Sequence, residues 1–149
     1  MMRTALVAGA LLLGAGAVMA QQDVAVTQQN LMKSAGKSMY GVLGKTLKGE
    51  TPYDQAAIDT ALKDLAADIA KAPAVFTPNP KEDVVNANYG SSQKIWQNKA
   101  DFDAKVPPAT KAIEDSSGKI KDAATLKVAF DSIQSKCSGC HDDYRVKLK

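Results

Sequence analysis

Two cysteines and the only histidine of the chain lie within five residues near the C-terminus, in the order Cys137-Ser138-Gly139-Cys140-His141. If this stretch is helical, both thiols and the imidazole lie on one face, because residues three and four positions apart are neighbours on a helix. This is the spacing of c-type haem attachment, in which two thiols bond the haem edge and the adjacent imidazole ligates the iron. The motif therefore predicts one covalently attached haem c, with Cys137 and Cys140 as thioethers and His141 as the proximal iron ligand.

Three other kinds of site use the same residue types. A redox dithiol is expected after a strand in a βαβ unit, and no strand pattern precedes Cys137. A structural disulfide gives no role to His141. A zinc site needs about four ligands, and beyond these three side chains the chain offers only carboxylates. Each alternative explains less of the motif than haem attachment does.

Apolar residues recur at intervals of three and four in four segments, which is the period of an amphipathic helix. The segments cover residues 23–47, 54–72, 92–117 and 122–148. Asp23 and Asp54 are predicted to cap the first two. The cysteine and histidine motif continues the apolar face of the fourth segment, so its cofactor would face the core. Without a strand pattern or an internal repeat, the sequence predicts an all-α, antiparallel, up-down-up-down four-helix bundle with the haem inside.

Two stretches interrupt this pattern. Residues 73–92 contain several prolines and no period, so we expect a long connecting loop. Pro107-Pro108 lies inside the third segment, and each proline lacks an amide donor. We therefore expect a kink or a short break there.

The first 20 residues have the features of a cleaved secretory signal peptide. Arg3 is followed by an apolar run over residues 5–17 and by the small-residue ending Val18-Met19-Ala20. An uncleaved membrane anchor is the alternative, but it would need about 20 continuous apolar residues, and glycines break this shorter run. We predict that residues 21–149 form the mature domain, which lies in the periplasm without stable membrane insertion.

The net charge is +3, and it falls to +2 when Arg3 leaves with the signal peptide. So small a charge does not favour binding to nucleic acid or to an anionic membrane.

The second iron ligand is not fixed by residue spacing. Because His141 is the only histidine, a second histidine of the same chain is excluded. The methionines that remain after signal cleavage are Met32 and Met39, which both lie on the apolar face of residues 23–47. A methionine in such a place usually fills the core. The residues alone leave three arrangements open: ligation by Met32, ligation by Met39, or an open iron that binds a small gas.

Four features of the sequence belong together: the signal peptide, the four-helix pattern, the C-terminal position of the motif, and the Tyr144-Arg145 pair after it. In these features the chain resembles the class II c-type cytochromes, which form the cytochrome c-prime superfamily. Three stretches resemble the low-spin cytochrome c-556 branch of this superfamily: TQQNLMK at residues 27–33, KGE at 48–50 and PYD at 52–54. In that branch a methionine of the first helix ligates the iron, so the resemblance implies Met32 as the distal ligand. Many relatives have Arg-Gln where this chain has Gln28-Gln29. High-spin relatives have a non-ligating residue in place of the methionine, and their iron binds nitric oxide or carbon monoxide.

The expected function is that of a periplasmic one-electron carrier, not an enzyme, with low-spin iron between His141 and Met32 and with redox proteins as partners. One alternative is a high-spin, five-coordinate protein that binds nitric oxide or carbon monoxide. Another is a helical interaction protein without haem. Arg145, four residues after His141, is a candidate for contact with a haem propionate, and pairing with Asp142 or exposure to solvent is the alternative. The sequence leaves monomer and homodimer open.

Overall fold

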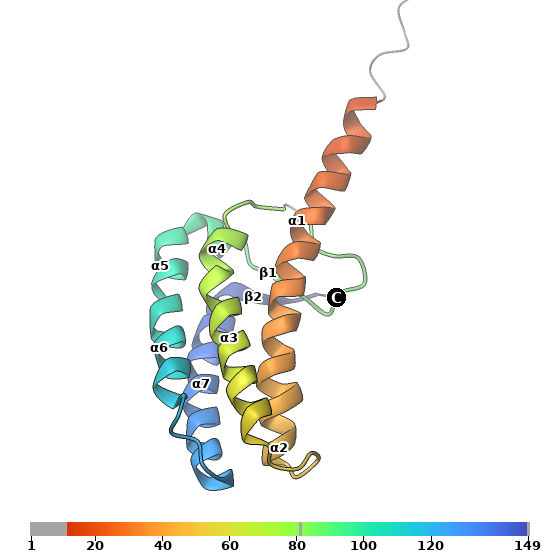
Figure 1. Ribbon diagram of the computed structural model, residues 1–149. Coiled ribbons are helices and arrows are strands. Elements are labelled where there is room, and N and C mark those ends of the chain that lie inside the picture. Colours follow the sequence, from red (N-terminus) through yellow and green to blue (C-terminus); the bar gives the residue numbers. More distant parts are fainter. Residues whose placement is uncertain (1–11, 81, 149) are drawn as a thin grey trace, which may run out of the picture.

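The computed structural model describes residues 12–80 and 82–148, with side chains from residue 23 onward. Four helical arms run antiparallel in one bundle, which confirms the predicted all-α architecture (Figure 1). The arms are formed by α1 (Leu12–Gly36), η1 (Lys37–Gly44) and α2 (Lys45–Leu47); by α3 (Gln55–Val75); by α4 (Lys94–Gln97), α5 (Lys99–Ala104) and α6 (Val106–Ser116); and by α7 (Ala123–Tyr144).

The first arm begins earlier than predicted. Of the predicted signal peptide, residues 1–11 lie outside the described residues, and residues 12–20 belong to α1, which extends beyond the bundle (Figure 1). The predicted cap at Asp23 is therefore wrong for the full chain, because the alanine-rich and leucine-rich residues before it continue the helix. Among the described residues, no helix is both long and apolar enough to cross a membrane.

A π-helical segment, η1, follows α1 without a break. The wider turn of a π-helix changes which side chains face the core. Here it buries Met39 and Leu43 and leaves Tyr40 half exposed. Gly44 faces α7, where a Cβ would lie at an ordinary van der Waals distance of 3.6 Å from a ring carbon of Phe130.

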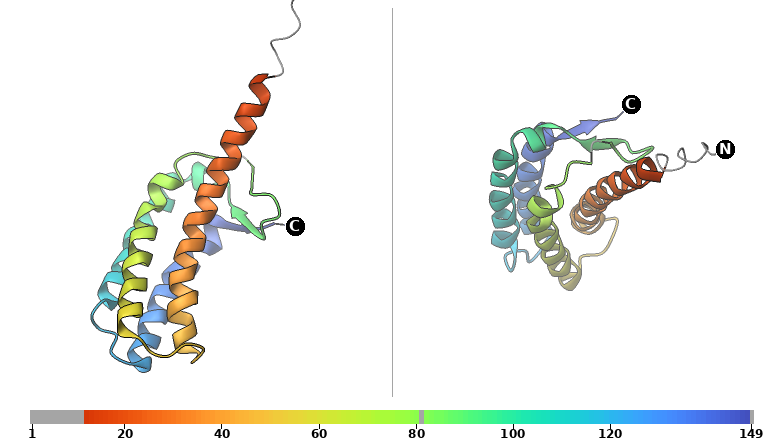
Figure 2. Two further views of the ribbon diagram at one scale, coloured as in Figure 1. Left: turned by 45° about the vertical axis from the view of Figure 1, so that its right-hand side comes forward. Right: turned by 90° about the horizontal axis from the view of Figure 1, so that it is seen from above.

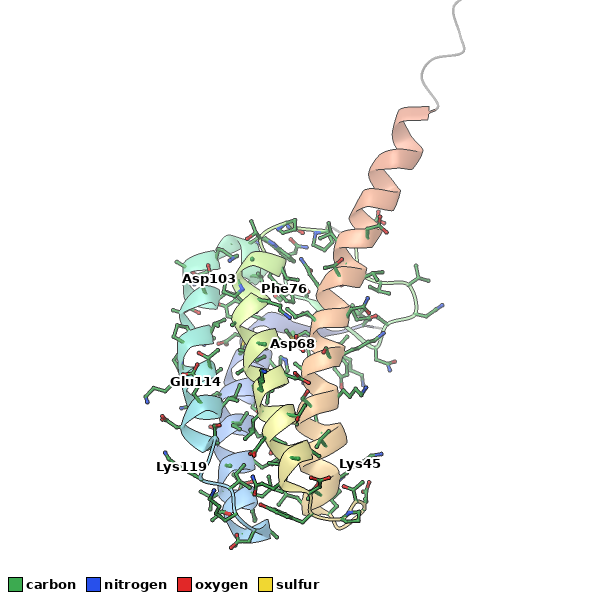
Figure 3. The ribbon with its side chains drawn as sticks, viewed as in Figure 1. Lys45, Asp68, Phe76, Asp103, Glu114 and Lys119 are labelled. Carbon is green, nitrogen blue, oxygen red and sulfur yellow. The ribbon has the colours of Figure 1, made fainter. Side chains whose placement is uncertain are left out.

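The second arm has its predicted cap but a later end. The Asp54 carboxylate accepts hydrogen bonds from the amides of Ala56 and Ala57, at 2.9 and 3.1 Å. The predicted end before Pro73 is wrong, because α3 continues to Val75. Burial of the next residue, Phe76, against the core holds this last turn in place (Figure 3).

Two short strands were not predicted. Strand β1 (Tyr89–Ser91) lies in the long connection between α3 and α4 and pairs antiparallel with β2 (Arg145–Lys147), which directly follows α7 (Figure 2). The expectation of a fourth helix that continues to residue 148 is therefore wrong, because α7 ends at Tyr144. A strand of three residues is too short to show a period of two, so the sequence carried no signal for it.

The third arm is broken near the predicted place. Pro107 and Pro108 do not kink a helix; they lie in the first turn of α6, and the break is at Lys105 just before them. The first turn of a helix needs no amide donors, so prolines are tolerated there. The fourth arm begins with a capping box, in which Asp122 accepts from the Thr125 amide and the Thr125 hydroxyl accepts from the Asp122 amide.

The core consists of two groups of buried side chains. The large cluster joins the first, second and fourth arms with α6, and consists of Ala35, Met39, Leu43, Ile58, Ala61, Leu62, Leu65, Ile113, Ile120, Leu126, Ala129 and Ile133. The aromatic cluster lies toward the end of the bundle where α3 stops, and consists of Leu31, Ala72, Phe76, Ile95, Phe102 and Tyr144. Within it, the rings of Phe76 and Phe102 and those of Phe102 and Tyr144 are 5.4 and 5.3 Å apart.

Candidate functional site

A cavity of about 450 Å³ lies between the first arm, α3, the β1 region and α7. Native cores contain few voids larger than a water molecule, whereas pockets for cofactors measure about 300–1,000 Å³. The cavity walls are mostly apolar. Its lining includes Met32, Gly36, Met39 and Tyr40 of the first arm, Leu65, Ile69 and Ala72 of α3, Tyr89 and Ser91 of β1, and Cys137, Cys140, His141 and Tyr144 of α7.

The structure places all three residues of the motif on the cavity wall. Cys137, Cys140 and His141 lie in the last turns of α7, which is helical there as predicted, and both cysteines are free thiols. The described residues that lead into the motif belong to α7 and not to a strand, and β1 lies in the earlier connection between α3 and α4. The strand-to-motif context expected for a redox dithiol is therefore absent from that part of the chain. The described residues also contain no group of three or more His, Cys, Asp or Glu side chains that could hold a metal ion by themselves.

Burial sets the protonation of these three groups. It raises the pKa of the Cys137 and Cys140 thiols above the usual value. Burial also lowers the pKa of His141, and the nearby Arg145 charge lowers it further, although Asp142 acts in the opposite direction. The imidazole is therefore neutral at neutral pH, and one ring nitrogen keeps the lone pair that a metal ligand needs.

The two cysteines contact different parts of the core. Cys137 packs against the large cluster, and Cys140 packs against the aromatic cluster. A planar group attached to both thiols would therefore extend along the boundary between the clusters.

The two methionines also differ in their surroundings, although both line the cavity. Met39 is only 2% exposed and belongs to the large cluster, as expected of a core-filling residue. Met32 is half-buried and packs against the aromatic cluster, the same cluster that Cys140 contacts. The sequence pattern did not separate the two, because both lie on the apolar face of one helix.

Arg145 is exposed, and its guanidinium lies over the Tyr89 ring, with 4.5 Å between Cζ and the ring centroid. Such stacking is a cation–π contact. Both side chains line the cavity. The pairing of β1 with β2 brings them together, so this contact could not be predicted without the strands.

Further residues at the site were missed by sequence reasoning. The Tyr144 hydroxyl donates a hydrogen bond to the Asp101 carboxylate, and Lys105 forms an ion pair of 2.9 Å with Asp143. Gln28 is a buried amide on the cavity wall. A polar residue on a largely apolar helix face was the available signal for Gln28, whereas nothing in the sequence connects residue 144 with residue 101.

The site residues fit a covalently held haem. Gly36 lines the cavity one turn after Met32, and a Cβ built on it would meet no atom within 4 Å. The first arm thus presents bare backbone to the cavity, which allows a flat ligand to approach closely. On the opposite wall, α7 supplies two free thiols and a neutral imidazole.

Comparisons with known proteins agree with this geometry. A family model described as "Cytochrome C'" matches residues 23–145. The chain is 56% identical to a cytochrome c-555 of Bradyrhizobium diazoefficiens over 149 residues, which covers 100% of both chains. The NMR-validated structural model of oxidized cytochrome c556 from R. palustris is similar with a TM-score of 0.73 and 39% identity, over 86% of this chain and 99% of that chain. A cytochrome c' structure from Rhodopseudomonas palustris gives a TM-score of 0.73 and 32% identity, over 85% and 98%.

Proposed function

The chain belongs to the cytochrome c' family, and from this premise we propose that it is a periplasmic one-electron carrier whose iron is ligated by His141 and Met32. Members of the family bind covalently attached haem c, so the protein is a haem c cytochrome. The observation that carries the finer proposal is that Met32 from the first arm and His141 from α7 line one cavity.

In this proposal each residue of the site has one task. Cys137 and Cys140 hold the haem as thioethers, His141 is the proximal ligand, and Met32 is the distal ligand. When bound, the haem supplies reversible exchange of one electron between ferric and ferrous iron. The chain orients the ring, keeps the imidazole neutral by burial, and keeps water away with the two clusters. A thioether ligand and apolar walls both favour ferrous iron, so they raise the reduction potential.

Burial and packing support Met32 over Met39 as the distal ligand. Met39 is enclosed by the large cluster, where movement of its side chain would open a void in the core. Met32 is only partly enclosed and shares the aromatic cluster with Cys140. The similarity to proteins named cytochrome c-555 and c556 supports the same assignment.

A second candidate is a high-spin, five-coordinate haem protein that binds nitric oxide or carbon monoxide. The similarity to a cytochrome c' structure favours it. The two candidates differ only in whether the Met32 sulfur reaches the iron.

The proposed location and partners rest on the sequence. The signal-peptide pattern of residues 1–20 supports export, and sequencing the N-terminus of the exported protein should give Gln21 first. The proposed partners are redox proteins that donate and accept the electron. Arg145 remains a proposed contact of a haem propionate, since it lines the cavity and its charge has the required sign.

Absorption spectra of the purified ferric and ferrous protein at neutral pH test the proposed function. Sharp, split ferrous bands and a weak near-infrared ferric band from methionine-to-iron charge transfer are expected. Broad high-spin bands, together with rapid binding of carbon monoxide to the ferrous protein, would instead establish the gas-binding candidate. A chain that carries no covalent colour on a denaturing gel, even when it is expressed with a haem attachment system, would overturn both.

A further inference from the structure

Gln28 is a buried polar side chain whose amide links three parts of the molecule. It lies on α1, one turn before Met32, and only 2% of it is exposed. Its Nε2 donates to the main-chain oxygens of Pro78 and Val75, at 2.8 and 3.3 Å. Its Oε1 accepts a long hydrogen bond of 3.5 Å from the Ser91 hydroxyl. A buried amide is costly to leave unpaired, so these bonds restrain α1 relative to all three partners.

The partners of Gln28 lie at both ends of the connection between α3 and α4. Val75 is the last residue of α3, where the carbonyl groups lack partners inside the helix. Pro78 follows it closely, and Ser91 ends strand β1. One side chain of α1 therefore fixes both where this connection leaves α3 and where it returns to the bundle.

From Ser91 the hydrogen bonds continue to the end of α7. Ser91 is paired with Arg145 between β1 and β2, and the Ser92 amide donates to the Tyr144 carbonyl at 2.9 Å. Tyr144 belongs to the last turn of the helix that carries the proximal ligand. A series of polar contacts thus connects the helix of the distal ligand with the helix of the proximal ligand, along a wall of the cavity that Gln28 and Ser91 both line.

We propose that Gln28 is a positioning residue, which fixes the turn of α1 that carries Met32 at the distance from α7 that iron coordination requires. The inference rests on the proposed function. The α1 helix packs along α3 and leaves the bundle at its N-terminal end, so the Gln28 bonds restrain it near the point where its packing stops (Figures 1 and 2). Because Met32 and His141 come from different helices, an outward movement of α1 would take the Met32 sulfur away from an iron held by α7.

The test compares two matched substitutions in the haem-loaded protein. Gln28→Leu keeps most of the volume and removes every hydrogen bond of the side chain. Asn30→Leu makes the same kind of change two residues away, on the exposed side of α1. Three quantities are measured: the fraction of high-spin ferric iron, the rate of carbon monoxide binding to ferrous iron, and the reduction potential.

For Gln28→Leu we expect about a tenfold larger ratio of open to methionine-ligated iron, which corresponds to about 1.4 kcal/mol. Carbon monoxide binding becomes faster in proportion and the potential falls, whereas Asn30→Leu leaves all three quantities unchanged. In a Met32→Ala background, Gln28→Leu should add nothing to the spin state or to the carbon monoxide rate. If Gln28→Leu fails to fold, Gln28→Ala serves instead, because it removes the same hydrogen bonds and cannot overfill the site.

The outcomes separate the two proposals. A low-spin wild-type protein whose Gln28 variants lose thermal stability but keep their spin state and carbon monoxide rate would overturn the positioning role alone. A high-spin wild-type protein would overturn the proposed function and this inference together. The same effect in Met32→Ala as in the wild type would show that Gln28 does not act through the thioether, and would also overturn the inference.

Discussion

The hydroxyl of Tyr144 donates a hydrogen bond to the carboxylate of Asp101, which joins the end of α7 to α5. Lys105, which follows α5, makes two further contacts with α7. It forms an ion pair with Asp143, and its Nζ lies 5.9 Å from the centroid of the Tyr144 ring. These contacts fix the last turn of α7, in which the proposed proximal ligand lies.

Replacing Tyr144 should weaken this attachment and change its pH dependence. We expect Tyr144→Phe to lower the free energy of unfolding by about 1 kcal/mol, because it keeps the ring and removes one hydrogen bond. The hydrogen bond to Asp101, with burial second, raises the pKa of Tyr144 to about 12. The folded protein therefore holds this proton more tightly than the unfolded chain, whose tyrosines ionise near 10.0. The stability that the Tyr144 hydrogen bond contributes is therefore fully present below pH 10.0, and it is lost as the pH rises toward about 12.

Urea unfolding of the wild type and of Tyr144→Phe, at about pH 8 and about pH 11, checks this prediction. The wild type should lose more stability between the two values than the variant does. Asp101→Asn keeps a hydrogen-bond acceptor but removes the negative charge, so it should move the alkaline loss to lower pH. Equal losses in all three proteins would contradict the role given to this hydrogen bond.

The two methionines should respond differently to the same substitution. Met32→Leu and Met39→Leu each remove a thioether and nearly conserve volume, so the change in packing alone should alter the free energy of unfolding by less than about 1.5 kcal/mol in each. We expect Met32→Leu to convert the ferric iron to high spin and to open it to carbon monoxide. Met39→Leu should keep the wild-type spectrum. The reverse result would make Met39 the ligand, and a low-spin spectrum in both would exclude a thioether from either residue.

The features that sequence reasoning predicted are those that local patterns encode. The helices of α3 and α7 follow from apolar residues at intervals of three and four, and Asp54 and Asp122 mark where they begin. The pentapeptide that ends in His141 indicates its chemistry through spacing alone. No contact distant in the sequence was needed for any of these predictions.

The features that were missed depend on contacts between distant residues. Strand β1 forms only because residues 89–91 meet residues 145–147. Met32 and Met39 look equivalent on a helical wheel, and the packing of each against a different cluster separates them. The η1 stretch contains Gly41 and Gly44, which lower its helix propensity, but low propensity does not by itself distinguish a π-helical turn from an α-helical one.

Adding a methyl group at Gly36 should disturb the haem more than it disturbs the fold. Gly36 has ordinary helical dihedrals, so alanine should increase helix stability by up to about 1 kcal/mol. Its new methyl group would, however, enter the cavity wall one turn from Met32. We therefore expect Gly36→Ala to shift the near-infrared band or to raise the high-spin fraction of the ferric protein.

Gly139→Ala is the matched control, because Gly139 is also helical, is exposed and does not line the cavity. It should stabilise α7 and leave the spectrum unchanged. Spectra and thermal unfolding of the two variants, recorded side by side, make the comparison. Identical spectra would mean that the first arm does not approach the haem at Gly36.

Asp68 is a buried carboxylate that the haem site does not use. It lies on α3 (Figure 3), and it is 8% exposed. One oxygen accepts a hydrogen bond of 3.1 Å from Lys71, whose side chain is 59% exposed, and the other has no partner among the described residues. An unsatisfied buried polar atom costs about 1–3 kcal/mol, whereas an exposed lysine gains little from its ion pair.

Asp68→Leu should therefore raise the free energy of unfolding by about 1 kcal/mol. Asp68→Ala, which adds no volume, should change stability in the same direction if leucine proves too large for the site. Asp64→Leu, on the exposed side of the same helix, should stay within about 0.5 kcal/mol of the wild type. Urea unfolding followed by circular dichroism measures all three variants with haem bound. If both Asp68 variants lose stability while Asp64→Leu does not, the second Asp68 oxygen must have a stabilising partner, such as an ordered water molecule.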